Sequence, residues 1–331
     1  MTDKPLDVLA IGNAIVDVIS DSDEAFLSVQ GLDKGSMRLI DEGEAVRLYG
    51  EMGPGRESSG GSAGNTVAGL AALGLKAGFI GQVAADELGR IFAHDLRATG
   101  VSFTTPTRDD VGPSARCLIL VTPDAQRTMN TFLGAAQRLP ATAISAAEVA
   151  SAKILYLEGY LWDPEEPRAA MEAAIDAARA AGTKVAFTLS DSFCISRHRD
   201  GFLKLIDDGR IDLLFANEDE ILALSGEAEF EAAVAAVAPK VQVLAVTRSE
   251  KGAIAVAGST RASVPAEPIK KLVDTTGAGD LFAAGFLAGQ ARGASLETSL
   301  KLGAIAAAEV IQHYGARPQA DLKALAGDLL S

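Results

Sequence analysis

The stretch DTTGAGDLFAAGFL, from Asp274 to Leu287, places two threonines and three small residues directly before the carboxylate of Asp280, which opens an apolar, helix-patterned run. The first backbone N–H groups of a helix lack partners and lie at the positive end of its macrodipole, so an anion is stabilised there. Gly277, Ala278 and Gly279 carry so little side chain that a phosphoryl group can approach the backbone closely. The stretch therefore predicts a phosphate cradle at a helix N-terminus.

Asp280 lies where a carboxylate would repel bound phosphate. An acid at that place is useful if it faces a hydroxyl group whose proton leaves as the phosphate arrives, so we interpret Asp280 as a general base. The alternative is a glycine turn in which the aspartate only caps the helix. The run of seven specific residues from Asp274 to Asp280 favours the catalytic interpretation.

The composition is that of a soluble globular chain and argues against several partners. The chain has 331 residues, 48% of them hydrophobic, and its 30 Lys and Arg against 44 Asp and Glu give a net charge of −14. This negative field argues against nucleic acid or an anionic membrane as a partner. Binding of a polyphosphate would need local attraction from a helix terminus, a few arginines and a divalent cation.

The two cysteines, Cys117 and Cys194, have no metal-ligand spacing, and we expect both to be reduced and buried. The N-terminal stretch MTDKPLDVLAIG, residues 1–12, has no basic region followed by a long apolar run. No apolar run elsewhere approaches membrane-spanning length. These features predict a cytoplasmic protein.

Short apolar runs alternate with helix-patterned segments through most of the chain, which is the pattern of βαβ units. We expect strands at residues 6–11, 77–83, 154–157, 184–188, 211–215 and 241–246. We expect helices at residues 65–73, 87–99, 166–181, 218–224 and 229–237. Right-handed crossovers between them predict an α/β fold with a mostly parallel sheet.

Two stretches break this alternation. Residues 14–50 contain short polar pieces spaced by glycines, and residues 114–132 have the pattern of a hairpin around TPDAQ, residues 122–126. We interpret both as a small β lid inserted into a single domain spanning residues 1–331, because no repeat or long linker divides the chain. Lid strands could pair between two copies, whereas an apolar lid suits a monomer, so monomer and homodimer both stay open.

Polar residues at two places predict a site for the hydroxyl groups of a sugar. In GGSAGN, Gly61, Ser62 and Asn65 precede or open a helix, and the alternative is that Asn65 only caps that helix. Asn13 and Asp17 follow the first strand, at the carboxyl edge where open α/β sheets bind ligands. Asp17 can accept protons from two neighbouring hydroxyl groups, and its alternative role is a turn or a surface charge.

Three later segments are candidates for binding a nucleotide and its metal: NEDE with Asn217 and Glu220, TRSEKG with Thr247, Arg248 and Gly252, and a helix end with His313 and Gly315. Each also has a purely structural alternative, namely a capping box, a hairpin turn and a glycine C-cap. Several other sites are excluded by spacing, because the chain has no GxxxxGK[ST], no GxGxxG after its first strand and no HExxH.

The motifs GGSAGN, NEDE and DTTGAGD, which follow one another along the chain in this expected order, resemble those of the ribokinase-like (PfkB) carbohydrate kinases. The resemblance covers nearly the whole chain and implies a three-layer αβα sandwich with a nine-stranded sheet and a β lid. It further implies the following roles: Asp280 as base, the amides of residues 277–280 as anion hole, Asp17 and Asn65 as sugar ligands, and Asn217 and Glu220 as organisers of Mg²⁺ and the phosphates of ATP. A monovalent cation such as K⁺ is implied near Asp274 and Gly315.

Three segments are similar to the nucleoside-using branch of that family, which includes the adenosine kinases: GNAIVD from residue 12, TPDAQRTMNTFLGAA from residue 122, and TLSDSF from residue 188. This likeness implies Arg127 near the phosphates and a base pocket of Met129, Leu133, Tyr160 and Trp162, although Trp162 is equally suited to core packing. We therefore expect ATP-dependent phosphorylation of the 5′-hydroxyl of a nucleoside. The alternatives are a kinase of a free sugar (ribose, fructose or an aminosugar) and a nucleoside-binding regulator without catalysis.

Overall fold

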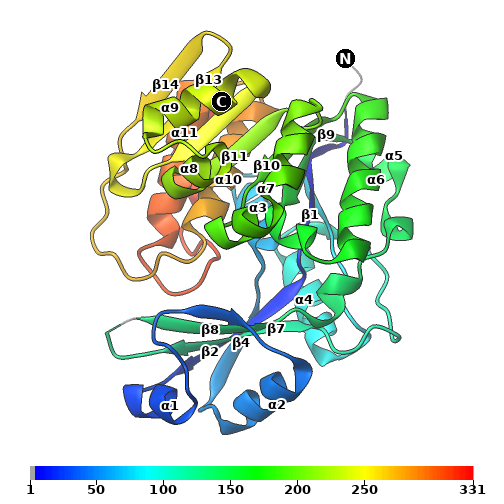
Figure 1. Cartoon of the computed structure of the whole chain (residues 1–331), viewed down its shortest axis with the longest axis vertical. Helices are drawn as coiled ribbons and strands as arrows, with labels where there is room; N and C mark the ends of the chain where they lie inside the picture. Colours follow the sequence, from blue (N-terminus) through cyan, green and yellow to red (C-terminus); the bar gives the residue numbers. More distant parts are fainter. Residues whose placement is uncertain (1–3, 125, 331) are drawn as a thin grey trace.

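The computed structural model describes residues 4–124 and 126–330, and within them the central element is a nine-stranded sheet (Figure 1). Across the sheet its strands are β14 (Thr260–Val264), β13 (Ala253–Ala257), β12 (Val243–Thr247), β11 (Leu213–Asn217), β10 (Lys184–Thr188), β9 (Ala152–Glu158), β1 (Leu6–Ile11), β5 (Ala77–Ile80) and β6 (Ser102–Phe103). Every neighbouring pair from β12 to β6 is parallel, and only β13 and β14 run antiparallel to their neighbours. The predicted α/β fold with a mostly parallel sheet is confirmed.

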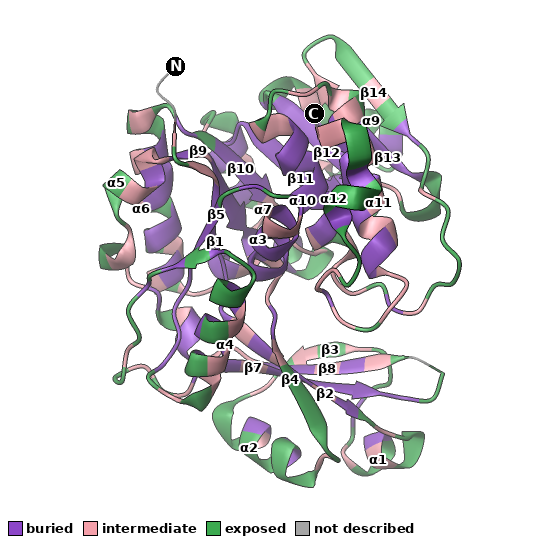
Figure 2. Cartoon of the chain, turned by 180° about the vertical axis from the view of Figure 1, so that it is seen from behind, coloured by how far each residue is buried: buried purple, intermediate pink, exposed green. Residues whose placement is uncertain are grey.

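Helices cover both faces of this sheet, because its strands are apolar on both sides. In β1, Val8 and Ala10 join one core cluster and Leu9 and Ile11 join the other. The first cluster packs under α3 (Ser62–Ala72), α4 (Glu87–Ala98), α10 (Ala278–Ala291), α11 (Leu296–Val310) and α12 (Leu322–Ala326). The second packs under α5 (Ala146–Ala150), α6 (Glu165–Ala181), α7 (Ser192–Asp207), α8 (Glu218–Ser225) and α9 (Phe230–Val237). The result is a three-layer sandwich whose strands and inward helix faces are buried (Figure 2).

A second sheet of five strands, in the described part of the chain, lies at one end of the sandwich (Figure 1). Its order is β3 (Met37–Leu39), β8 (Arg127–Phe132), β7 (Ala115–Val121), β2 (Ile15–Asp21) and β4 (Gly55–Ser59). We call it the small sheet. One of its faces is covered by α1 (Glu24–Val29) and α2 (Glu42–Glu51), where Val18 and Leu118 pack with Leu27 and Leu48.

The predicted hairpin at residues 114–132 is present as the antiparallel pair β7 and β8. Ala125, in its predicted turn, and residues 1–3 of the N-terminal stretch lie outside the described residues. The segment expected at residues 14–50 contributes β2 and β3, but the chain also adds β4 to the small sheet at Gly55–Ser59, beyond that range. The strand β4 is not predicted because its sequence, GRESS, is polar, as suits an exposed strand at the edge of a sheet.

Element boundaries differ from the prediction mainly where glycines or buried side chains lie outside the regular element. β1 and β10 have the predicted limits, whereas β11 and β12 begin two residues later, after the buried side chains of Ile211 and Val241. α3 begins at Ser62, three residues before the prediction, because Gly61 with φ +81° is its N-cap. Asn65 therefore lies inside the helix and does not cap it.

Short 3-10 helices complete the described chain: η1 (Gly134–Arg138), η2 (Ala141–Ala143), η3 (Gly159–Trp162), η4 (Ala238–Lys240), η5 (Ser249–Lys251) and η6 (Gly327–Leu330). Both cysteines are free and buried, as expected. Among the described helices, none combines the length and the apolar character needed to cross a membrane.

Candidate active site

The N-terminus of α10 has the geometry of an anion site. Gly277 is its N-cap with φ +79°, a conformation that favours glycine, and a Cβ there would lie 2.7 Å from the Cβ of Ala316. Ala278 N donates to Thr275 O (3.2 Å), so one of the predicted anion-hole amides is already used. The N–H groups of Gly277, Gly279 and Asp280 have no hydrogen-bond partner among the described residues. These donors are the ones available to an anion.

Asp280 is joined to the segment GGSAGN, which lies more than two hundred residues away in the sequence. Ser62 Oγ donates to Asp280 Oδ1 (2.6 Å), and Asn65 Nδ2 donates to Asp280 Oδ2 (2.9 Å). Burial raises the pKa of Asp280 above its ordinary value, while these two hydrogen bonds and the charge of Arg317 act in the opposite direction. Asn65 Oδ1 is buried without a partner and is thus an acceptor left open beside the carboxylate.

Asp17 lies close to the same segment. A Cβ on Gly60 would lie 2.4 Å from Asp17 Oδ2, and one on Gly61 would lie 2.2 Å from the backbone oxygen of Asn13. The two glycines therefore allow the strand end and the loop to approach each other. Burial raises the pKa of the Asp17 carboxyl to about 6, against the lowering effect of the Arg317 and Arg127 charges.

Glu158 is a functional candidate that the sequence analysis missed. It is fully buried at the end of β9, and its Oε1 accepts from both Asn13 N (2.7 Å) and Asn13 Nδ2 (2.8 Å). Its Oε2 accepts from Ala63 N (2.8 Å), so one carboxylate ties the end of β1 to the start of α3. Burial raises the pKa of Glu158 to about 7. The available signal was an acid ending the apolar run ILYLEG, at a sheet edge that binds ligands.

Arg127, on β8 of the small sheet, reaches the loop that precedes α10. Its guanidinium pairs with the Asp274 carboxylate and donates to Thr276 Oγ1, and both charged side chains are almost fully buried. Asp274 also accepts from Thr276 N (3.0 Å) and from Gly315 N (3.0 Å). The face of the small sheet that carries Arg127 is thus turned toward the start of α10. His313, next to this loop, contacts Glu309 Oε1 through its Nε2 (3.1 Å).

The NEDE segment forms the capping box that was its structural alternative. Asn217 Oδ1 accepts from Glu220 N (2.8 Å), and the Glu220 carboxylate accepts from Asn217 N (2.9 Å) and Asn217 Nδ2 (2.7 Å). Burial raises the pKa of Glu220 to about 7. Both carboxylate oxygens therefore already have a partner within the protein.

The TRSEKG segment is the tight connection between β12 and β13, which pair antiparallel, so the hairpin alternative describes its backbone. Thr247 ends β12, and Gly252 has φ +86° in the turn. Arg248 donates to Glu218 Oε1 (2.9 Å), and its guanidinium lies 3.8 Å from the centre of the Phe230 ring. Arg248 is thereby directed to α8 and α9.

The predicted base-pocket residues do not form one group. Met129 belongs to an apolar cluster on the small sheet with Ile119 and Ile19. Leu133 follows β8 as the N-cap of η1, and the Tyr160 hydroxyl donates to Ser190 O (3.3 Å). Trp162 is 5% exposed and lies in the second core cluster, which fits its alternative role in core packing.

Replacing Trp162 by alanine is expected to destabilise the fold without changing the KM for the substrate that accepts the phosphoryl group. The indole packs edge-on against Phe187 and Phe202, with ring centres 6.4 and 6.0 Å away. Removing such a core side chain costs about 3 to 5 kcal/mol, so thermal unfolding of Trp162→Ala should shift well below the wild type. Phe193→Ala, at a side chain that is 59% exposed, is the control with little expected shift. A raised KM for the acceptor at full stability would contradict the core assignment.

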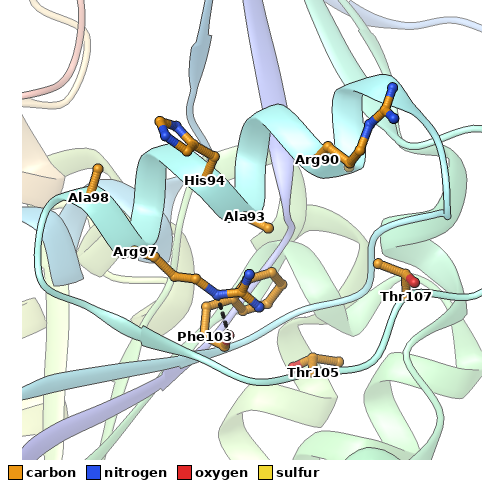
Figure 3. A pocket seen from close by; sticks show the side chains of 9 residues that line it. Arg90, Ala93, His94, Arg97, Ala98, Phe103, Thr105 and Thr107 are labelled. Carbon is orange, nitrogen blue, oxygen red and sulfur yellow. Dashed lines mark hydrogen bonds between the residues drawn. The ribbon is translucent and has the colours of Figure 1, made fainter.

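A surface hollow of about 500 Å³ lies apart from these residues, between α4 and the segment from Phe103 to Thr107 (Figure 3). Arg97 Nε donates to Phe103 O (2.9 Å) across it, whereas Arg90 and His94 point away from it (Figure 3). It contains none of the predicted site residues.

Comparison with known proteins identifies close relatives over almost the full length. The family model described as pfkB family carbohydrate kinase matches residues 7–322. A probable sugar kinase protein from Rhizobium etli CFN 42 has 48% sequence identity and a TM-score of 0.92, with 98% of each chain covered. An adenosine kinase from Sinorhizobium meliloti has 48% identity and a TM-score of 0.91, covering 97% of this chain and 98% of its own. The adenosine kinase of Saccharomyces cerevisiae is 26% identical, and the match covers 93% of this chain and 95% of the relative.

Proposed function

The chain belongs to the pfkB family of carbohydrate kinases, and from that membership we propose that it transfers the γ-phosphoryl group of ATP to the 5′-hydroxyl of a nucleoside. Kinases of this family use ATP as phosphoryl donor, typically with Mg²⁺. The similar proteins include both an adenosine kinase and a probable sugar kinase, so their names leave the acceptor undecided. The choice of a nucleoside depends on residues of this chain.

One observation carries the choice: an apolar row lies next to Asp17 on the inward face of the small sheet. Strand register aligns Ile19, Ile119 and Met129 across β2, β7 and β8. Asp17 lies two residues before Ile19 and so on the same face, as does Arg127, whose contact with Asp274 directs that face toward α10. Hydroxyl groups held at Asp17 would therefore have apolar surface directly beside them.

This apolar surface suits the planar base of a nucleoside better than it suits the remaining hydroxyl groups of a free sugar. A free sugar carries hydroxyl groups around its ring, and burying them against Ile19, Ile119 and Met129 would leave their hydrogen bonds unmade. A nucleoside presents its hydroxyl groups on the ribose and a flat base on the other side. The row thus supports a nucleoside, with Ile19 and Ile119 joining Met129 in the base pocket and the small sheet acting as the lid.

Phosphoryl transfer at this site would use Asp280 as the base. The acceptor O–H proton moves to the Asp280 carboxylate while the acceptor oxygen bonds to the γ-phosphorus, and the bond from that phosphorus to the ADP oxygen breaks. Ser62 and Asn65 hold the carboxylate, and the free Asn65 Oδ1 is an acceptor for a ribose hydroxyl group. The N–H groups of Gly277, Gly279 and Asp280 would bind the phosphoryl oxygens.

The donor set fits a Mg²⁺ ion that arrives with the nucleotide. Among residues 4–124 and 126–330, no group of three or more His, Cys, Asp or Glu side chains could hold a metal ion alone. Mg²⁺ at nucleotide sites is usually bound by phosphates, waters and only one or two carboxylates. Glu220, whose oxygens already accept from Asn217, suits a contact through water. The ion would neutralise charge on the phosphates.

The other candidates for binding ATP are assigned from their position at the carboxyl edge of the nine-stranded sheet. Thr247, Gly252 and the loop with His313 and Gly315 remain our candidates for contacts with ATP. Arg127 would contact the phosphates of ATP after breaking its ion pair with Asp274. Asp274 also accepts from Thr276 N and Gly315 N, and its carboxylate, once Arg127 has left it, remains our candidate for contact with a monovalent cation such as K⁺.

The proposal is tested by supplying ATP and Mg²⁺ with a panel of nucleosides, ribose, fructose and an aminosugar, and measuring ADP release. Turnover with nucleosides only is expected, and turnover with free sugars only would contradict the proposal. Met129→Thr should raise the nucleoside KM roughly tenfold, because apolar contacts of this size are worth about that much. Met52→Thr is the matched control and should leave KM unchanged, because Met52 is the C-cap of α2 and packs against the opposite face of the small sheet.

A further inference from the structure

A short segment after α11, residues 315–317, contacts Asp274, the start of α10, the end of β4 and the first turn of α3. The N–H of Gly315 donates to Asp274 Oδ2 (3.0 Å), and Ala316 lies against the N-cap glycine of α10. Arg317 follows and extends toward β4 and α3. Neither a motif nor the family resemblance pointed to Arg317.

The Arg317 guanidinium bridges two elements through three hydrogen bonds. Its Nε donates to Ser59 O (3.1 Å) and its Nη2 to Ser59 Oγ (3.1 Å), at the end of β4. Its Nη1 donates to Gly64 O (2.6 Å), in the first turn of α3. A planar guanidinium can serve acceptors on two sides at once, whereas a lysine ammonium has no such fork. The residues between these anchor points include Gly60 and Gly61, which open the GGSAGN segment.

The backbone that carries Arg317 is itself held in place. Glu309, buried on α11, accepts from Gln319 N (2.9 Å) and Ala320 N (2.8 Å) through its Oε1. With Gly315 tied to Asp274 on the other side, the chain is fixed both before and after Arg317. The guanidinium is thus pre-positioned and does not depend on an exposed, mobile side chain.

We propose that Arg317 is a positioning residue for phosphoryl transfer, which fixes the loop presenting Ser62 and Asn65 to Asp280 and supplies the positive charge shared by Asp17 and Asp280. The inference rests on Asp280 being the base of the proposed reaction. A guanidinium that only held the fold together would affect stability and leave the reaction's dependence on pH and acceptor unchanged.

The charged groups around Arg317 make its charge matter. Three carboxylates interact electrostatically with it: Asp17 on β2, Asp280 on α10 and Asp95 on α4. The charges of Arg127 and Asp274 also affect the pKa of Asp17. The charge of Asp280 raises the pKa values of Glu158, Tyr156 and Tyr160. Burial raises the pKa of both Asp17 and Asp280, and the Arg317 charge lowers each. Loss of that charge would therefore leave both carboxylates protonated to a higher pH.

The test compares Arg317→Gln and Arg317→Lys with the wild type, using the acceptor that the wild type phosphorylates. Arg317→Gln should raise the acceptor KM by about 5- to 30-fold, the effect of losing one or two hydrogen-bond equivalents. It should also move the acidic limb of the kcat/KM profile upward by about one pH unit. In Arg317→Lys the acidic limb of the kcat/KM profile should return toward that of the wild type, because the positive charge is kept. The KM should stay raised, because the forked hydrogen bonds of the guanidinium are lost.

Arg292→Gln is the matched control, since this exposed arginine also bonds a backbone oxygen, that of Leu330, beyond the far end of α10. It should keep the wild-type KM and pH profile. A wild-type KM and an unmoved limb in Arg317→Gln would overturn the inference, even with a lower Tm. Should Arg317→Gln fail to fold, a wild-type KM in Arg317→Lys would overturn it as well. Turnover with free sugars only would contradict the proposed acceptor and would still allow this comparison.

Discussion

Asp280→Asn is expected to lower kcat by about 10²- to 10⁴-fold, which is the usual contribution of a positioned general base. The amide cannot accept the proton of the acceptor hydroxyl group, whereas Asp17 and Asn65, the ribose ligands that we propose, keep their side chains. Nucleoside binding, measured by calorimetry, should therefore stay close to that of the wild type. Steady-state kinetics with the preferred acceptor provide kcat.

A second readout of the same variant is its stability as a function of pH. The raised pKa of Asp280 means that the folded state prefers the protonated acid, so its contribution to stability is present at low pH and is lost as pH rises through that pKa. An asparagine has no such loss. The Tm of Asp280→Asn relative to the wild type should therefore increase between pH 4 and pH 7.

Asp321→Asn is the control for both readouts. Asp321 caps α12 through Lys323 N and Ala324 N, and asparagine caps helices about as well as aspartate. This variant should keep the wild-type kcat and Tm. Wild-type turnover in Asp280→Asn would refute the assignment of the base.

Gly277→Ala is expected to lower kcat by about 10²- to 10³-fold, the loss seen when one oxyanion donor is displaced. The residue has φ +79°, and its new Cβ would lie 2.7 Å from the Cβ and 2.9 Å from the Cα of Ala316. Because Ala316 belongs to a tied segment, the start of α10 has to move. The N–H groups of Gly279 and Asp280 would then no longer point at the phosphoryl oxygens. Rapid-mixing or steady-state assays would detect the lower kcat.

Gly293→Ala separates this effect from backbone strain alone. Gly293 lies just after α10 with φ +75°, and a Cβ there meets nothing within 4 Å. The two substitutions impose a similar left-handed strain, of about 1 to 2 kcal/mol, at the two ends of one helix. Gly293→Ala should lose stability and keep kcat. Equal kcat values for the two variants would contradict an anion site at Gly277.

Local patterns in the sequence predict the architecture well. Apolar runs mark β1 and β10 well, since strands covered on both faces carry nearly continuous apolar side chains, here residues 8–11 and 185–187. The hairpin of β7 and β8 follows from two strand-like runs on either side of a turn. The edge strand β4 escapes notice because its exposed side chains are polar.

The site itself is only partly visible in the sequence, because its key contacts join distant residues. Glu158 binds Asn13 across 145 positions, and Arg317 binds Ser59 across 258. Residues in such pairs carry no local spacing that would mark them. The pair Asp280 and Asn65 could be suspected only because each belongs to a short motif.

Some motifs fit two structures equally well until packing decides between them. A spacing of three suits Asn217 and Glu220 both as a capping box and as ligands around a metal, and the structure contains the box. Trp162 has the same sequence context as a core residue or as a pocket wall, and its contacts with Phe187 and Phe202 make it a core residue.

The most direct measurement is a crystal structure with ADP, Mg²⁺, the preferred acceptor and a planar phosphoryl analogue such as aluminium fluoride. The account predicts the analogue within hydrogen-bond distance of the N–H groups of Gly277, Gly279 and Asp280. The acceptor oxygen should lie about 3 Å from the Asp280 carboxylate, the reach of a general base. An analogue bound away from the start of α10, or an Asp280 side chain turned from the acceptor, would contradict the account.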